Sequence, residues 1–335
     1  MPISTADAVA LARRLWTALP DRRDDALAVL NGLFGDHLEA ADSSLAIPLR
    51  LYGGPEREPL GEPPAFDPGP RTCLLVHGLM GTEHAWALGT GPDGAQELGK
   101  ALGEARDVKP IYARYNTGRH ISINGRQLAE RLEALHVASP LRELTIVAHS
   151  MGGLVTRSAC HYGLEQGHGW VEHLQRVFLL GVPSHGAPLE QLVHVAAFTL
   201  ESIWNPWTKL IGRALNLRSA GIKDLRHGFV LDEDWRHRDP DQLALRRPRP
   251  ADQPEHVQWY VVAGTLGRLD GAWAQILGDG LVRAGSAHGK GFGTPTPGLL
   301  PQAQTLVLPE ISHMGLMNDP RVLEQVLQWW PPIDA

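Results

Sequence analysis

Short apolar runs alternate with segments of helical composition from Thr72 to the C-terminus. Each run is bounded by Gly, Pro or polar residues, which is typical of buried strands. The runs occupy residues 72–76, 108–112, 144–148, 177–180, 256–263 and 305–308. Strands that alternate with helices form a parallel sheet covered on both faces. We therefore predict an α/β fold with a mostly parallel central sheet and helices on both faces.

The segments between these runs predict helices over residues 82–102, 123–135 and 151–163. A last helix is expected after residue 319, with Asp319 as its N-cap and Pro320 at its first position. The apolar residues of this helix recur at a spacing that forms a buried stripe, namely Val322, Val326, Leu327 and Trp330.

The chain before this alternating region has a different character. Residues 5–40 predict one or two helices, and the alternating pattern over 47–51 predicts a short strand. Residues 53–71 are rich in Gly and Pro and indicate a linker. We expect an N-terminal helical extension over 1–52, an α/β core over 72–188 and 257–332, and an insertion over 189–256 that forms a lid or cap.

Composition excludes several functional classes. The chain has 335 residues, 43% of them hydrophobic, so extensive disorder is excluded. Lys and Arg number 31 against 37 Asp and Glu, without a basic cluster, so no nucleic-acid partner is expected. Two cysteines are too few for a disulfide scaffold. No leader peptide or transmembrane segment is apparent, which favours a cytoplasmic protein.

The strongest chemical signal lies in residues 148–153, Ala-His-Ser-Met-Gly-Gly. A predicted strand passes into a predicted helix through Ser150 alone, which forces this serine into a strained conformation and exposes its hydroxyl. The residues two positions on either side must be small, and Ala148 and Gly152 meet this need. The N–H of Met151 opens the helix and can serve as one donor of an oxyanion hole.

A second signal follows the first predicted strand of the sheet, in His77-Gly78-Leu79. Acyl transfer needs two N–H donors for the oxyanion, and the Leu79 N–H can be the second. We interpret His77 as a structural hydrogen-bonding residue. His149 is also interpreted as structural, because side chains one position apart diverge at a sharp turn.

A serine nucleophile requires a base and an orienting acid. His313 follows the last predicted strand and therefore lies at the carboxyl edge of the sheet, where sites of open α/β sheets gather. The acid should lie between Ser150 and His313. Asp279, between two glycines, is favoured over Asp270, while Glu310 is too near His313 to fold back onto it.

Taken together, these segments resemble the α/β hydrolases of the lipase and esterase type over residues 72–330. The turn at Ser150, with Ala148 as its first residue, is similar to that of small bacterial lipases. The segments GVPSHGAPL and DGLV together resemble the lipases grouped with GPI inositol-deacylase-like proteins. The matching segments are VHGLMG (76–81), AHSMGG (148–153), GVPSHGAPL (181–189), DGLV (279–282) and ISHMGL (311–316).

The resemblance implies Ser150 as the nucleophile, His313 as the base and Asp279 as its orienting acid. It implies an oxyanion hole formed by the N–H groups of Leu79 and Met151. Supporting residues of the site would be His77, Gly78, His149 and Gly152. No metal and no organic cofactor is required.

We therefore expect a serine esterase or lipase that acts on small-molecule or lipid esters with lipophilic acyl groups. The insertion carries Phe198, Trp204 and Trp207, which line an acyl pocket or cover it, or simply pack on the domain. Transient contact with a lipid surface is compatible with such a cover. Two alternatives stay open, namely the same triad on a thioester, amide, inositol-linked or polyester acyl bond, and a non-catalytic binding protein of this fold.

Overall fold

A computed structural model of the chain describes residues 4–17, 23–54, 56–87, 96–186, 219–236, 248–265, 300 and 302–332. Its centre is a sheet of eight strands in the order β2-β1-β4-β3-β5-β6-β7-β8. The strands are β1 (Arg50–Gly53), β2 (Glu58–Pro59), β3 (Arg71–Val76), β4 (Val108–Arg114), β5 (Leu144–His149), β6 (Leu174–Leu180), β7 (Gln258–Thr265) and β8 (Gln304–Pro309). The six strands from β3 to β8 are parallel to one another, whereas β1 is antiparallel to both β2 and β4.

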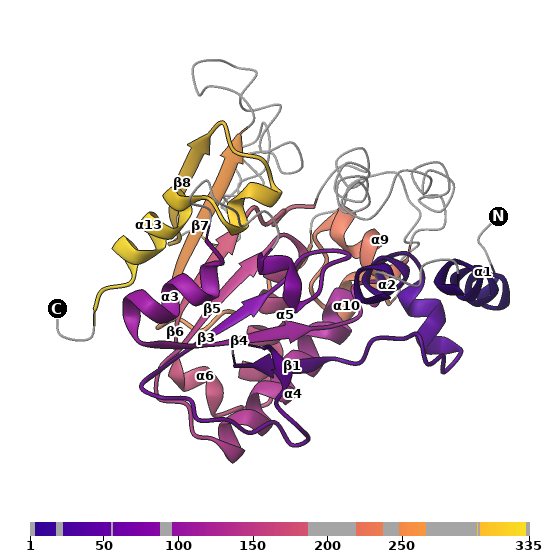
Figure 1. Cartoon of the computed structure of the whole chain (residues 1–335), viewed down its shortest axis with the longest axis horizontal. Helices are drawn as coiled ribbons and strands as arrows, with labels where there is room; N and C mark the ends of the chain where they lie inside the picture. Colours follow the sequence, from indigo (N-terminus) through magenta and orange to yellow (C-terminus); the bar gives the residue numbers. More distant parts are fainter. Residues whose placement is uncertain are drawn as a thin grey trace.

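Helices surround the sheet (Figure 1). In the described residues, the α-helices are α1 (Thr5–Thr17), α2 (Arg23–Ala40), α3 (Leu98–Arg106), α4 (Ile121–Ala138), α5 (Met151–Glu165), α6 (Trp170–His173), α9 (Ala220–His227), α10 (Asp232–Trp235) and α13 (Pro320–Trp329). The 3₁₀ helices of the same described residues are η1 (Glu83–Ala87) and η4 (Met314–Met317).

The two faces of the sheet bury separate apolar cores. Successive strand residues point to opposite faces, so Leu74 and Val76 pack with α4 and α5 on one face. Cys73 and Leu75 pack with α3 and α13 on the other face. Trp330 is fully buried in this second core, where its ring stacks near Phe178. Every strand from β3 to β6 is thus covered on both sides, as the near-continuous apolar runs predicted.

All six predicted parallel strands are present, with ends shifted by a few residues. The predicted cap of the last helix is also confirmed, because the Asp319 carboxylate accepts a hydrogen bond from the Arg321 N–H at 2.9 Å. The helix predicted over 82–102 is wrong as one element, since the structure has η1 and α3 there. The sequence between them contains Gly89, Gly91 and Pro92, which are poor helix formers.

Strand β1 begins at Arg50, later than the strand predicted over 47–51. Pro48 has no N–H to donate, which disfavours it within a paired strand. Tyr52 of β1 pairs with Tyr112 of β4 and with Pro59 of β2. Part of the Gly- and Pro-rich segment therefore extends the sheet at its edge.

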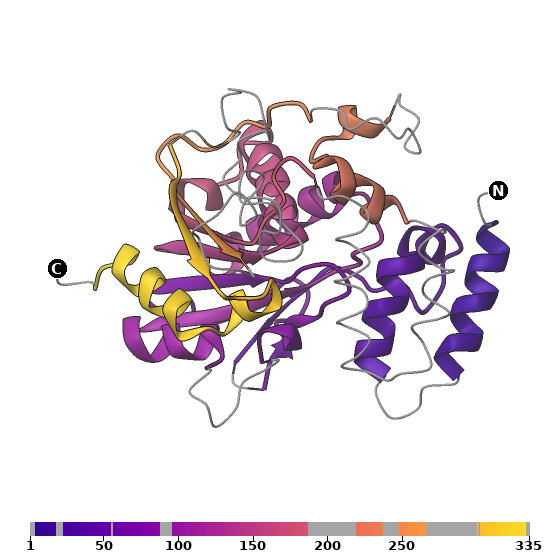
Figure 2. The same cartoon turned by 90° about the horizontal axis from the view of Figure 1, so that it is seen from above.

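The helices predicted for residues 5–40 are present as α1 and α2, which lie side by side at the end of the molecule opposite the C-terminus (Figure 2). Helix α2 buries most of its residues, among them Leu33, Phe34 and Leu38. These side chains belong to the same core as those of α4 and α5. Helix α2 is therefore packed against the sheet domain.

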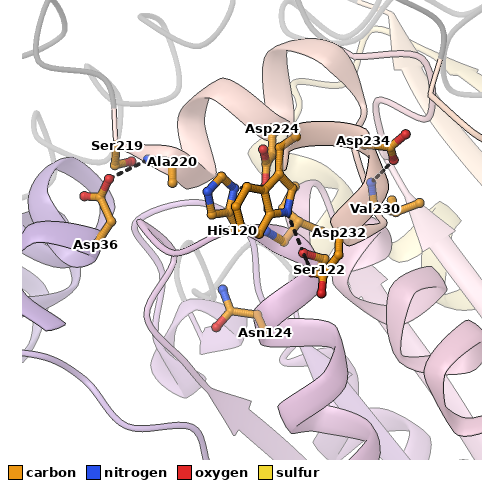
Figure 3. Close-up of polar contacts among 12 residues, drawn as sticks. Asp36, His120, Ser122, Asn124, Ser219, Ala220, Asp224, Val230, Asp232 and Asp234 are labelled. Carbon is orange, nitrogen blue, oxygen red and sulfur yellow. Dashed lines mark hydrogen bonds and ion pairs between the residues drawn. The ribbon is translucent and has the colours of Figure 1, made fainter. Parts of the chain in front are cut away.

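Residues 219–236 are attached to α4 by buried carboxylates (Figure 3). Asp224 accepts hydrogen bonds from the Ile121 N–H and from His120 Nδ1, both at 2.9 Å. The His120 ring stacks on Trp235 with 3.6 Å between ring centroids. Desolvation raises the pKa of Asp224, and these donors oppose that rise. The first turn of α4 thus receives an acceptor from a segment about a hundred residues away in sequence.

Replacing Asp224 by Ala would leave the Ile121 N–H and the His120 ring without this acceptor. We expect the free energy of unfolding to fall by about 1–3 kcal/mol, because unsatisfied buried donors bear their full desolvation cost. Urea denaturation followed by circular dichroism measures the change. Asp252→Ala is the control, since Asp252 is largely exposed and its loss should change stability by about 0.5 kcal/mol or less. Equal losses in the two variants would contradict this role of Asp224.

Candidate functional site

Ser150 occupies a strained junction between β5 and α5. Its φ and ψ angles are 54° and −125°, a combination that residues with side chains rarely adopt. Strand β5 ends at His149 and α5 begins at Met151, so the chain turns on this single residue. The Ser150 N–H donates to the Leu180 carbonyl at 2.9 Å, which ties the turn to the end of β6. The sharp turn predicted from the sequence is present.

Small residues allow the neighbouring backbone to approach this turn. A methyl group at Gly152 would overlap the carbonyl oxygens of Val76 and His77 at the end of β3. A methyl group at Gly78 would lie 2.9 Å from Ser150 Cβ. The loop after β3 therefore lies directly against the serine, with Leu79 as its next residue. Ser150 Oγ is buried and has no hydrogen-bond partner within the described part of the chain.

His313 lies at the same edge of the sheet, on the loop between β8 and η4. A methyl group at Gly181, the residue after β6, would lie 2.9 Å from His313 Nδ1. The His313 ring is 4.5 Å, centroid to centroid, from the ring of His149. His149 directly precedes Ser150, so the structure brings the two sequence-predicted residues Ser150 and His313 to one place.

His149 connects this loop to the serine turn. Its Nε2 atom lies 3.0 Å from the His313 carbonyl oxygen, and because a carbonyl can only accept, Nε2 carries the proton. Burial lowers the pKa of His149 well below its ordinary value, and the neighbouring His313 lowers it further. His149 is therefore neutral and donates a hydrogen bond to the loop that contains His313.

His77 supports the loop after β3 in a similar way. Its Nδ1–H donates to the Gly78 carbonyl at 2.8 Å, and its ring stacks on Tyr115 with 4.5 Å between centroids. Burial is the main cause that lowers the pKa of His77 to about 4. The imidazole is neutral at pH 7.

Two residues near the site were not singled out by the sequence. The Tyr115 hydroxyl donates to the His77 carbonyl at 2.7 Å, and Thr117 Oγ1 accepts from the Met80 N–H at 3.1 Å. Both follow the carboxyl end of β4. A sequence signal for them existed, since residues at the carboxyl ends of parallel strands gather around the site.

Several predicted residues lie outside the described part of the chain. They are Asp279 and its alternative Asp270, together with Phe198, Trp204 and Trp207 of the insertion. Within the described residues, no group of three or more His, Cys, Asp or Glu side chains is arranged to hold a metal ion. None of the helices described there is long and apolar enough to cross a membrane.

Solved structures that are similar to this chain include three bacterial enzymes. The mature form of a Bacillus licheniformis lipase is 21% identical, with 78% of this chain and 92% of that chain covered and a TM-score of 0.48. Naproxen esterase from Bacillus subtilis is 14% identical, with coverages of 84% and 87% and a TM-score of 0.43. The esterase RhEst1 from Rhodococcus sp. is 15% identical, with coverages of 84% and 93% and a TM-score of 0.44.

A search of curated proteins finds no significant match. A family model described as the PGAP1-like alpha/beta domain matches residues 68–240. With the mostly parallel sheet and its two layers of helices, this match confirms the predicted α/β-hydrolase fold. The matched segment is just over half of the 335 residues, and the chain therefore belongs to the family of PGAP1-like α/β domains.

Proposed function

We propose that this chain is a serine hydrolase that cleaves carboxylic esters with lipophilic acyl groups. The observation that carries the proposal is the strained Ser150 turn, which lies against Gly78 while His313 lies beside His149 at the same edge of the sheet. Backbone strain at a buried serine is costly and is maintained where the residue has a function. The lipophilic acyl group is inferred from Phe198, Trp204 and Trp207 of the insertion.

In the proposed reaction, neutral His313 takes the proton of Ser150 Oγ as this oxygen attacks the ester carbonyl. Asp279 orients the imidazole and stabilises the imidazolium. The N–H groups of Leu79 and Met151 hold the tetrahedral oxyanion. The Met151 N–H suits this role because the first N–H groups of a helix have no intrahelical acceptor.

Collapse of the tetrahedral intermediate breaks the bond to the alcohol, which leaves with the proton held by His313. Water then attacks the acyl-enzyme, with His313 again as the base, and releases the carboxylic acid and the free serine. The same sequence of steps applies to a thioester, amide, inositol-linked or polyester acyl bond, so the choice of substrate depends on the shape of the pocket.

Ser150→Ala should abolish the hydrolysis of p-nitrophenyl esters with acyl chains of two to sixteen carbons. Loss of a serine nucleophile reduces kcat by about a million-fold, which places turnover below detection. Ser158→Ala is the matched control, because Ser158 is a buried serine within the helix that follows Ser150, and its hydroxyl donates to the Val230 carbonyl. The control should keep its turnover.

Turnover that persists in Ser150→Ala would contradict the proposed nucleophile. Absence of turnover on every ester, together with failure of a fluorophosphonate to label Ser150, would instead favour a non-catalytic binding protein. The chain-length optimum separates an esterase from a lipase, and panels of thioesters and amides test the other acyl bonds.

The base and the acid can be tested by substitution and kinetics. His313→Ala should reduce kcat as severely as Ser150→Ala, and the double variant should be no worse, because the two residues act as a unit. Asp279→Asn should reduce kcat by about 10⁴-fold through the wrong imidazole tautomer. Asp270→Asn serves as the comparison and should keep near-normal kcat. The reverse result would assign the orienting role to Asp270.

A further inference from the structure

Helix α2 contacts the loop that contains the proposed oxyanion donor, although α2 lies outside the segment matched by the family model. Gly32 of α2 faces Met80, the residue after Leu79. A methyl group at Gly32 would overlap Met80 Cγ and would lie 3.3 Å from Thr117 Oγ1. The absence of a side chain at Gly32 therefore lets α2 approach both Met80 and Thr117.

Met80 needs such support because its backbone is strained. Its φ angle is 58°, which a non-glycine residue adopts at an energetic cost and keeps only where its surroundings fix it. The Met80 N–H donates to Thr117 Oγ1 at 3.1 Å, and both side chains are buried. At the other end of the loop, the Tyr115 hydroxyl donates a hydrogen bond to the His77 carbonyl. Residues after β4 thus fix the loop on both sides of Leu79.

Helix α2 also holds the loop between β4 and α4, from which Thr117 comes. The Asn116 side-chain amide donates to the Gly35 carbonyl at 2.9 Å. A methyl group at Gly118 would overlap the Asn31 carbonyl oxygen, so the two backbones are in close contact. Thr117 therefore lies between two residues that contact α2.

Residues 219–220 also bind α2. The Ser219 hydroxyl donates to the Gly32 carbonyl at 2.7 Å. The Ala220 N–H donates to the Asp36 carboxylate at 2.9 Å (Figure 3). The position of α2 over Met80 is thus determined by hydrogen bonds from two separate segments, in addition to its apolar contacts.

We propose that Gly32, Met80 and Thr117 form a clamp that positions the Leu79 N–H for the oxyanion, which makes α2 a positioning element of the active site. This inference rests on the esterase function proposed above. A donor stabilises the oxyanion only when it lies about 2.7–3.1 Å from that oxygen. The conformation at Met80 sets the direction of the preceding peptide groups, so loosening the clamp moves the donor.

Two substitutions disturb the clamp in different ways. Gly32→Ala introduces the methyl group that overlaps Met80, and Thr117→Val removes the acceptor of the Met80 N–H at nearly constant side-chain shape. We expect each to lower kcat about 10- to 100-fold, because small misplacements of catalytic groups have effects of this size. KM should stay within about twofold, since the oxyanion exists only in the transition state.

Rescue variants separate positioning from general damage. Thr117→Ser keeps the acceptor and should retain near-normal kcat. The double variant Gly32→Ala with Met80→Ala removes the overlapping Cγ and should recover part of the kcat lost in Gly32→Ala. Affinity for a trifluoromethyl ketone, which forms a tetrahedral oxyanion on the serine, should fall in parallel with kcat.

Gly163→Ala is the control for stability alone. It also places a methyl group in a tight helix contact, 2.8 Å from the Trp170 ring, near the far end of α5 from Ser150. All kcat values are divided by the concentration of active sites, titrated to completion with a fluorophosphonate. The control should lower the thermal midpoint without changing kcat per active site.

The outcomes distinguish the clamp from the proposed function. If Gly32→Ala and Thr117→Val behave like Gly163→Ala, with kcat per active site unchanged, the clamp is refuted while the esterase stands. If the unaltered chain has no Ser150-dependent turnover, the proposed function fails and the clamp fails with it. A kcat loss in both variants that Thr117→Ser avoids supports the clamp.

Discussion

The change from strand to helix at one residue, Ser150, is the constraint around which this edge of the sheet is arranged. A backbone with φ of 54° carries about 1–3 kcal/mol of strain and persists only where its surroundings hold it. Here β5 is buried between β3 and β6, and the Ser150 N–H is bound to the Leu180 carbonyl. Gly152 and Gly78 leave room for the backbone of the loop after β3. The strained turn at the end of β5 is thus held by contacts with the ends of β3 and β6.

Two of the sixteen histidines of the chain, His77 and His149, are buried next to the Ser150 turn, although histidine is a common catalytic residue. His77 and His149 are both neutral, because burial depresses their pKa values, and each uses a ring N–H to bind a carbonyl oxygen. A neutral imidazole serves here as a flat, rigid donor that fits between backbone segments. Substitution by an apolar residue would remove the hydrogen bond and leave the buried carbonyl oxygen without this donor.

Segments beyond the six parallel strands contact one another and the loops near Ser150. Residues 219–236 are bound to α4 through Asp224 and Asp232, and to α2 through Ser219 and Ala220. Helix α2 in turn lies over Met80 and the loop after β4. Hydrogen bonds and close contacts therefore connect the parts of the chain before β3 and after β6 to the loops near Ser150.

The sequence by itself determined the features that depend on neighbouring residues. Alternating apolar runs predicted the parallel strands, the Ala-His-Ser-Met-Gly-Gly segment predicted the strained turn at Ser150, and Asp319-Pro320 predicted the start of α13. Hydrophobic periodicity, steric limits on a turn and helix capping are local effects, so they can be recognised within a short stretch of sequence.

Only the tertiary structure decided which distant residues meet. The antiparallel addition of β1 to β4, the contact of His149 with His313 and the bond from Ile121 to Asp224 join residues far apart in the chain. Gly32 and Gly35 are poor helix formers within α2, and their use became evident only from the approach of Met80 and Asn116. Such contacts arise from packing between elements, and no local pattern specifies the partner.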